Sequence, residues 1–249
     1  VLVFLVVFVL ARGVGSITPD LFSLEYSTEN ASVIPAIVNT LEMTVIALVI
    51  AVPIGICAAI FLVEYTNITG KIVGIIRITA ETLSGIPSIV YGLFGMLFFT
   101  IALGLGYSML SGAFTLAIMV LPLIMRTSEE ALKSVPVSYR EASFGLGAGK
   151  LRTIFKIVLP AAMPGILSGI ILATGRIVGE TAALLYTAGS VAQYATPMSS
   201  GRTLAVHMYV LSNEGLYMDK AFATAVILLI MVLLINAISS FFAKKITKG

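Results

Sequence analysis

The chain has 249 residues, of which 59% are hydrophobic and 11% charged, with a net charge of +3 and a mean hydropathy of +1.08. A soluble domain carries about 25% charged residues, so this composition excludes one and predicts a membrane protein. No compact basic domain stands apart from the apolar runs, which argues against nucleic-acid binding. The single cysteine, Cys57, lies in an apolar run and excludes an internal disulfide and a cysteine-based metal cluster.

The apolar runs are long and continuous, without the alternation of barrel strands, and therefore predict membrane-spanning helices. The first run, residues 1–11, is shorter than the roughly 20 residues that a span needs, so we interpret it as the second half of an incomplete first span. A signal peptide is the alternative, which the lack of a clear small-residue cleavage pattern disfavours. The remaining predicted spans are residues 37–63, 72–103, 113–124, 165–186 and 221–242.

The distribution of basic residues predicts the orientation of these spans. Eleven of the fifteen basic residues fall in residues 64–77, in residues 126–156 or in the C-terminal tail. Only Arg12, Arg202 and Lys220 fall on the other side, and Arg176 lies within a predicted span. Because cytoplasmic loops carry an excess of Lys and Arg, we expect a cytoplasmic C-terminus and an extracytoplasmic segment at residues 187–219.

Residues 141–160, EASFGLGAGKLRTIFKIVLP, form a polar and basic segment between two apolar runs. Residues 136–148 are predicted to form a short helix that Pro136 opens, with Ser138 as its N-cap. Gly145, Gly147 and Gly149 are then expected to end this helix in a flexible turn. The chain would return to the membrane over residues 150–158, where Pro160 and Pro164 bend the entry into the next span. Composition alone also allows an ordinary basic cytoplasmic loop.

The spacing within residues 136–160 resembles the EAA loop of ABC importer permeases. That pattern is Glu-Ala-Ala, three residues, Gly, nine residues, Ile, any residue and Leu-Pro, and only Ser143 departs from it. The resemblance implies an all-α integral membrane protein with the MetI-like transmembrane fold, a single permease domain over residues 1–249 with about six spans, and a cytoplasmic coupling helix that sits in a groove of an ATPase subunit. In such a complex, small Ala142 and Ser143 permit close approach, Glu141 pairs with a basic residue of the groove and Gly147 turns the chain. The matching residues are Glu141, Ala142, Ser143, Gly147, Ile157, Leu159 and Pro160.

Two charged residues, Arg176 and Glu180, fall within the fifth predicted span. An Arg at the centre of a spanning helix costs about 2.5 kcal/mol or more, so its presence suggests a function. On a continuous helix both residues share an arc of about 80° with small residues that let another helix approach closely. One interpretation is a structural i,i+4 ion pair. The other is an anion contact, in which Glu180 holds the planar fork of Arg176 and limits tight capture. The small residues on this arc are Gly165, Gly169, Ala173 and Ala183.

Three further stretches resemble phosphate importer permeases, especially the A-type permease subunits of phosphate-specific (Pst) transporters. They are GRIVGETAALLYTAG at residues 175–189, SGIPSIVYGLFG at residues 84–95 and TLAVHMY at residues 203–209. The resemblance implies inorganic phosphate as substrate, a homologous partner permease, a dimer of ATPases, an extracytoplasmic phosphate-binding protein, the cell membrane as location and no cofactor. The implied pathway residues are Arg176, Gly179, Glu180, Thr181, Ser84, Pro87 and Ser88.

Alternative functions are a related oxyanion permease, for molybdate or sulfate, and an ion-coupled secondary carrier. The chain lacks the Gly-x-x-x-x-Gly-Lys-Ser/Thr phosphate loop, so we expect no ATP hydrolysis by this subunit and no catalytic residue. Pro87 is expected to break the third span, either as part of a gate or as a packing kink. Arg77 and Glu81 are predicted to form an interfacial pair, and His207 is predicted to be structural, with no metal site.

Overall fold

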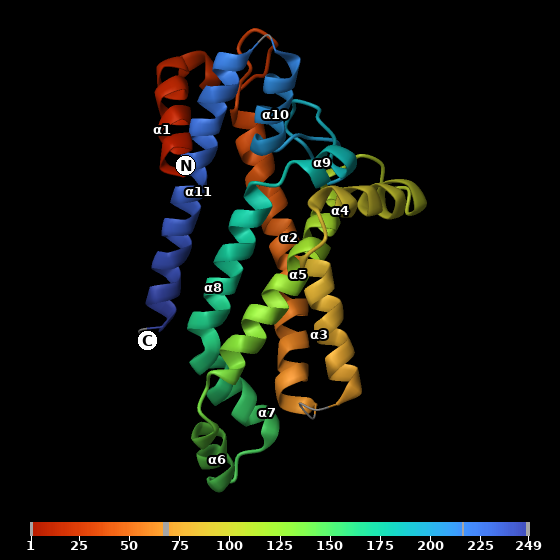
Figure 1. The fold of residues 1–249 in the computed structure, drawn as a ribbon, viewed down its shortest axis with the longest axis vertical. Helices are drawn as coiled ribbons and strands as arrows, with labels where there is room; N and C mark the ends of the chain where they lie inside the picture. Colours follow the sequence, from red (N-terminus) through yellow and green to blue (C-terminus); the bar gives the residue numbers. More distant parts are fainter. Residues whose placement is uncertain (1, 67–69, 216, 248–249) are drawn as a thin grey trace. The chain divides into compact units, whose positions relative to one another are not determined.

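The computed structural model describes residues 2–66, 70–215 and 217–247. Val1 and Lys248, which belong to the predicted first span and to the basic residues counted above, lie outside them. All regular elements in the described ranges are helical, as predicted. The α-helices are α1 (Leu2–Gly13), α2 (Ile34–Ile60), α3 (Lys71–Ser84), α4 (Ser88–Gly95), α5 (Met109–Lys133), α6 (Val137–Gly145), α7 (Lys150–Thr153), α8 (Leu159–Val178), α9 (Ala182–Thr187), α10 (Leu204–Glu214) and α11 (Met218–Thr247) (Figure 1).

Three wider π-helical turns extend or join these helices. The turn η3 (Phe61–Tyr65) prolongs α2, η4 (Met96–Ala102) prolongs α4, and η5 (Ile154–Val158) joins α7 to α8. Pro160, which follows η5, has no backbone N–H to donate into this turn, so a wider turn is tolerated there. Two short 3₁₀ helices, η1 (Val14–Ser16) and η2 (Pro19–Phe22), follow α1.

Four helical segments of the described chain are long and apolar enough to cross a membrane, and a fifth candidate is the broken pair of α3 with α4 and η4. The four are Ile34–Tyr65, Met109–Lys133, Lys150–Val178 and Met218–Phe241. A shorter apolar helix, Val3–Ser16, lies near the start of the described chain. The predicted break of the third span is confirmed, because α3 ends at Ser84 and α4 begins only at Ser88.

Two predicted spans had wrong bounds. The fourth was expected to end at residue 124, but α5 continues to Lys133, since its polar last turns are stabilised by i,i+4 ion pairs. The fifth was expected to be one helix over residues 165–186. It is helical from Lys150 without a break at Pro160 or Pro164, and it ends at Val178, before Gly179.

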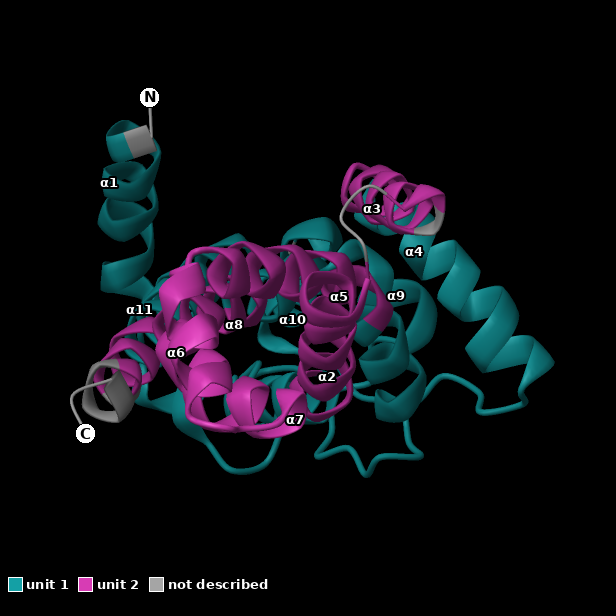
Figure 2. Ribbon diagram, turned by 90° about the horizontal axis from the view of Figure 1, so that it is seen from below, with its two compact units in different colours: residues 1–47, 87–117, 175–235 teal, residues 48–86, 118–174, 236–249 magenta. Residues whose placement is uncertain are grey.

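The chain divides into two compact units, coloured separately in Figure 2. Unit 1 comprises residues 1–47, 87–117 and 175–235, and unit 2 comprises residues 48–86, 118–174 and 236–249. Each of the four long helices contributes one part of its length to each unit. The predicted coupling segment belongs to unit 2, whereas Arg176 and Glu180 belong to unit 1.

Unit 1 has an apolar core that joins α2, α10 and α11 to the segment after α1. Asn39 of α2 fixes the segment after α9 to this core, because its Nδ2 donates to the carbonyls of Gln193 and Arg202 at 2.9 and 3.1 Å. Its Oδ1 accepts from the Ala195 N–H at 3.0 Å. The buried apolar members of the core are Leu21, Val33, Ala36, Val178, Leu204, Ala223, Ile227 and Met231.

Unit 2 has its own core, in which the ends of α2 and α5 pack against η5 and the start of α8. Gly165 and Gly169 face α5 closely, since a Cβ on Gly165 would lie 2.6 Å from Ala131 Cβ and one on Gly169 would collide with Thr127. The predicted close helix approach is therefore confirmed at these two positions. The buried members of the core are Ala59, Ile60, Ala131, Leu132, Val135, Ile154, Val158, Ala162 and Ile166.

Candidate coupling segment and substrate pathway

The predicted coupling helix exists as α6, with a left-handed turn after it. Pro136 occupies the N-cap position and Ser138 lies inside the first turn, so the prediction that Ser138 caps the helix was wrong. The helix ends at Gly145, and Gly147 adopts a φ of +80°, which a residue with a side chain rarely adopts. Leu146, in the turn, is 89% exposed. The chain thus presents a short helix and an apolar tip.

Arg140 fixes α6 to two neighbouring elements of unit 2. Its Nε and Nη2 donate to Glu64 Oε1 at 3.1 and 2.7 Å, which ties α6 to the end of α2. Its Nη1 and Nη2 also donate to the carbonyls of Val135 and Leu132, at 2.9 and 3.0 Å, beside the last turn of α5. Both charged side chains are largely buried, with 16% of Arg140 and 9% of Glu64 exposed. The sequence analysis missed this pair, because 76 residues separate its members.

Ser143, the residue that departs from the Ala of the EAA pattern, has a contact within the chain. Its Oγ lies 2.8 Å from Thr153 Oγ1, and both residues are buried. The Ser143 carbonyl also accepts from the Ala148 N–H at 3.1 Å. The hydroxyl therefore holds α6 against the returning helix α7, a role that its small size alone did not indicate.

Most of the predicted coupling residues surround one hollow of about 460 Å³ in unit 2. Ala142, Ser143, Gly147 and Ile157 line it, together with Tyr139, Leu146, Ala148, Arg152 and Lys156. Glu141 is exposed on α6 but is not among the lining residues. Leu159 packs instead against the core of unit 2, and Pro160 is exposed. The surface around α6 thus combines apolar side chains, two cations and one exposed carboxylate.

In unit 1, α4 packs closely against α9, which brings two of the predicted pathway stretches together. A Cβ on Gly92 would lie 2.8 Å from Ala183 Cα, and one on Gly95 would lie 2.8 Å from Thr187 Cγ2. Only glycine permits this distance between the two helices. The helix that begins at Ser88 therefore lies beside the one that follows Glu180.

Arg176 and Glu180 do not form the predicted i,i+4 arrangement, because α8 ends at Val178 between them. Glu180 is buried, and its Oε1 accepts from the Ala183 N–H at 3.1 Å, in the first turn of α9. A carboxylate is stabilised at this end of a helix. Arg176 is half-buried. Within the described chain, Arg176 has no carboxylate at ion-pair distance, so the ion pair and the holding role of Glu180 were both wrong.

The other predicted pathway residues are divided between the two units. Pro87 and Ser88 form the start of α4, and Gly179 and Thr181 flank Glu180 at the break between α8 and α9, all in unit 1. Ser84 belongs to unit 2, where it is exposed and its Oγ donates to the Ala80 carbonyl at 3.0 Å. The two helix breaks, at Pro87 and at Gly179, are thus the common feature of this set.

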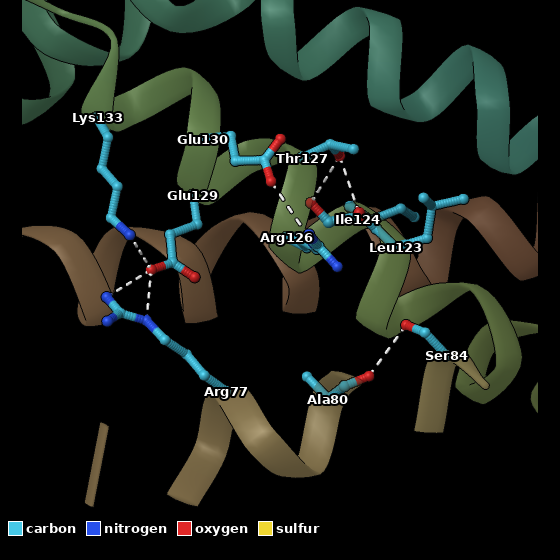
Figure 3. Close-up of polar contacts among 10 residues, drawn as sticks. All are labelled: Arg77, Ala80, Ser84, Leu123, Ile124, Arg126, Thr127, Glu129, Glu130 and Lys133. Carbon is cyan, nitrogen blue, oxygen red and sulfur yellow. Dashed lines mark hydrogen bonds and ion pairs between the residues drawn. The ribbon is translucent and has the colours of Figure 1, made fainter. Parts of the chain in front are cut away.

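A network of charges in unit 2 was not predicted. Arg77 Nε donates to Glu129 Oε1 of α5 at 2.8 Å, and Arg77 Nη2 lies at the ion-pair distance of 2.6 Å from the same oxygen, so Arg77 does not form the predicted pair with Glu81 (Figure 3). Lys133 Nζ reaches the same oxygen at 2.6 Å. The spacing of Glu129 and Lys133, four residues apart on a polar helix end, could have indicated half of this network. The partner on α3 could not be read from the sequence.

His207 is fully buried at the start of α10 in unit 1. Its Nε2 lies 3.2 Å from the Ala31 carbonyl, and its ring meets Tyr26 edge to face with the centroids 6.2 Å apart. Burial, followed by the nearby charge of Arg202, lowers the His207 pKa to about 3, so the ring is neutral. Among the described residues no group of three or more His, Cys, Asp or Glu side chains could hold a metal ion.

The helical fold with its candidate membrane spans is that of a membrane transport component, and the family match shows the class. The chain belongs to the family described as the binding-protein-dependent transport system inner membrane component, which matches residues 51–249.

Among curated relatives, a Bacillus subtilis protein named a probable ABC transporter permease, YqgI, is 34% identical over 95% of this chain and 86% of its own length. The phosphate transport system permease protein PstA of Xylella fastidiosa is 34% identical over 91% of this chain and 80% of its own. PstA 1 of Mycobacterium tuberculosis is 44% identical over 62% of this chain and 50% of its own.

Solved structures of ABC transporters share the fold at low identity. A bacterial alginate ABC transporter matches with a TM-score of 0.72 and 17% identity, over 98% of this chain and 88% of that chain. The MetNI methionine ABC transporter, in an inward-facing conformation, matches with a TM-score of 0.66 and 20% identity, over 97% of this chain and 98% of that chain.

Proposed function

We propose that this chain is a permease subunit of an ATP-driven inorganic phosphate importer in the cell membrane. The observation that carries the proposal is that one continuous helical segment, Lys150–Val178, leads from the coupling residues to Arg176. The similarity to proteins named phosphate transport permeases supports phosphate as the substrate. In this function the chain forms half of a pathway with a homologous permease and hydrolyses no ATP itself.

The coupling part of the proposal assigns α6 and the hollow beside it to a groove of a separate ATPase subunit. Glu141 is exposed for a basic partner residue, and Leu146 offers an apolar tip. Arg140 would pass a displacement of α6 to α2 and α5 through Glu64 and the carbonyls of Leu132 and Val135. When two ATPase subunits close on each other, α6 and the corresponding helix of the partner permease would then move as rigid bodies.

The substrate part assigns Arg176, with the helix breaks at Pro87 and Gly179, to the phosphate pathway. A guanidinium without a carboxylate partner suits transient contact with a tetrahedral oxyanion, since its planar fork offers several donors. The extracytoplasmic side would receive phosphate from a binding protein, with the C-terminus in the cytoplasm. Permeation requires weak binding, which one cation near the break can supply.

Uptake of labelled phosphate by cells that carry the complete transporter tests the substrate, with molybdate and sulfate as competitors. We expect phosphate uptake that excess molybdate or sulfate does not suppress. Preferential uptake of molybdate or sulfate would assign the chain to a related oxyanion importer. Uptake that continues without any ATPase subunit would indicate a secondary carrier instead.

Glu141→Arg tests the coupling assignment. The substitution should release the ATPase from the purified permease and abolish uptake, because a cation would then face the basic groove. Glu141→Gln is the matched control and should retain part of the association, since it removes the charge without reversing it. ATPase that still co-purifies with Glu141→Arg, together with normal uptake, would contradict docking at α6.

A further inference from the structure

Unit 2 contains a hollow that the proposed function does not use, between α3 and α5. Its volume is about 230 Å³, against roughly 30 Å³ for a water molecule in the liquid, so a five-atom oxyanion fits within it. Three cations and three carboxylates line it, together with Ser84 of the predicted pathway. The charged lining residues are Arg77, Arg126, Lys133, Glu81, Glu129 and Glu130.

Two of these cations converge on a single oxygen atom. Arg77 Nε and Nη2 and Lys133 Nζ lie 2.6–2.8 Å from Glu129 Oε1, and in Figure 3 the two side chains approach that oxygen from different sides. The Glu129 side chain is only 7% exposed, whereas 31% of Arg77 and 43% of Lys133 remain exposed. A planar fork and a point cation around one oxygen are the donors that bind phosphate oxygens.

We propose that Arg77 and Lys133 form a second binding site for a phosphate-type oxyanion, and that the Glu129 carboxylate occupies it as an internal competitor. The ligand is either free phosphate or the phosphate group of a lipid, because both present the same oxygens. That transported phosphate would pass this site rests on the proposed function. The binding chemistry itself does not.

Weak binding follows from the charges. The three lining carboxylates balance the three lining cations, so an incoming oxyanion has to displace Glu129 and adds negative charge. Arg126 and Glu130, which pair at 3.2 Å, are 61% and 66% exposed and leave the rim of the hollow open to water. A site with a built-in competitor releases its ligand readily, as a step on a pathway requires.

The coupling helix can change this balance. Arg140 of α6 donates to the carbonyls of Leu132 and Val135, which flank Lys133 in the chain. A displacement of α6 would therefore move Lys133 relative to Arg77 on α3. When Lys133 moves away from Glu129 Oε1, the Glu129 carboxylate loses one of its two cations. The affinity of the site for the oxyanion then changes.

Phosphate-induced thermal stabilisation of the assembled permease–ATPase complex, in nanodiscs of phosphatidylcholine, tests the site. Glu129→Gln should lower the half-maximal phosphate concentration about tenfold, because the competitor loses its charge. Lys133→Gln, at an exposed position, should raise it about tenfold. These effects should persist in an Arg176→Gln background, which removes the pathway cation.

A purely structural ion pair predicts a different pattern. In that case Arg77→Gln and Glu129→Gln would each lower the melting temperature, and the double variant would restore it. Phosphate would raise the melting temperature of all these variants equally. This pattern would overturn the proposal. Replacing phosphatidylcholine with phosphatidylglycerol identifies the source, since a headgroup ligand stabilises the complex through Lys133 without added phosphate. The site is also refuted if neither ligand acts through Lys133. Labelled phosphate uptake by the wild type separates this result from failure of the proposed function.

Discussion

The charged side chains of the two units differ in how they are paired. All four ion pairs of the described residues lie in unit 2, where Glu64, Glu129 and Glu130 pair with four cations. In unit 1 two arginines lie over aromatic rings instead, with Arg202 Cζ 4.7 Å from the Tyr26 ring centroid and Arg12 Cζ 5.9 Å from that of Phe8. Four cations of unit 2 are thus paired with carboxylates of the same unit, whereas among the described residues Arg176 of unit 1 has no carboxylate at ion-pair distance.

Local geometry explains this difference. In unit 2 polar helix ends lie beside one another, so Arg140 and Arg77 reach carboxylates that are 76 and 52 residues away. In unit 1 the helix stops between Arg176 and Glu180, and the carboxylate bonds to a backbone amide instead. Two oppositely charged residues four positions apart thus remain separate, because i,i+4 pairing requires a continuous helix.

Arg140→Ala should produce the largest effect on stability. Removing one partner of a buried, hydrogen-bonded pair costs about 3–5 kcal/mol, because Glu64 is left buried without its cation. Thermal unfolding of the purified complex measures this loss, and Arg140→Lys should recover only part of it. A loss of less than about 1 kcal/mol in the free energy of unfolding would show that the ion pairs of unit 2 contribute little to stability. The contrast with unit 1 would then have no energetic basis.

Arg176→Gln should lower phosphate uptake by about 10- to 100-fold without loss of assembly. A charge-assisted hydrogen bond contributes about 1.5–3 kcal/mol, and each 1.4 kcal/mol corresponds to a factor of ten. Uptake of labelled phosphate and co-purification of the partner subunits are the two measurements. Arg176→Lys retains the charge and should be less impaired. Normal uptake by Arg176→Gln would return this cation to a structural role.

His207 should make the stability of unit 1 depend on pH. Its pKa is about 3 in the folded protein and near 6.5 when unfolded, so the unfolded chain binds the extra proton first. The stabilisation is complete above pH 6.5 and is lost as the pH falls toward 3, by up to about 1.4 kcal/mol per pH unit. Melting temperatures between pH 7.5 and 4.5 should show this slope, and His207→Gln should flatten it. An unchanged slope in the variant would assign the pH dependence to other groups.

Arg126→Ala should have the smallest effect on stability, within about 0.5 kcal/mol. Its pair with Glu130 is 3.2 Å long and both side chains are more than half exposed, so water competes with the pair. The same melting experiment as for Arg140→Ala applies. A loss as large as that of Arg140→Ala would mean that burial does not rank the ion pairs of unit 2.

The helical class, the broken third span and the short helix α6 could be predicted, because each rests on a local signal. Long apolar runs predict helices, Pro87 removes a backbone donor, and Gly147 supplies the left-handed turn. The extent of α5 could not be predicted from hydropathy, since ion pairs extend the helix beyond its apolar part. Periodicity also could not show that α8 ends at Val178, because a mainly apolar stretch continues at residues 182–186 beyond Gly179, Glu180 and Thr181.

For the candidate site, the sequence predicted several of the residues that gather there but not the side chains that they contact. Ala142, Ser143, Gly147 and Ile157 do gather around one hollow. The partners of Ser143 and Arg77 are Thr153 and Glu129, which the fold brings close from other elements. Such contacts depend on packing between segments that are distant in the chain, and one sequence carries no direct record of them.

Asn39 has a consequence for the engineering of chimeric permeases. One side-chain amide on a membrane helix accepts or donates all of its hydrogen bonds within residues 193–202, and a Cβ on Gly201 would lie 2.9 Å from Asn39 Nδ2. Residues 193–202 are therefore not a free-standing loop that can be exchanged by its ends alone. A graft that replaces residues 193–202 has to carry the matching residue of α2 with it.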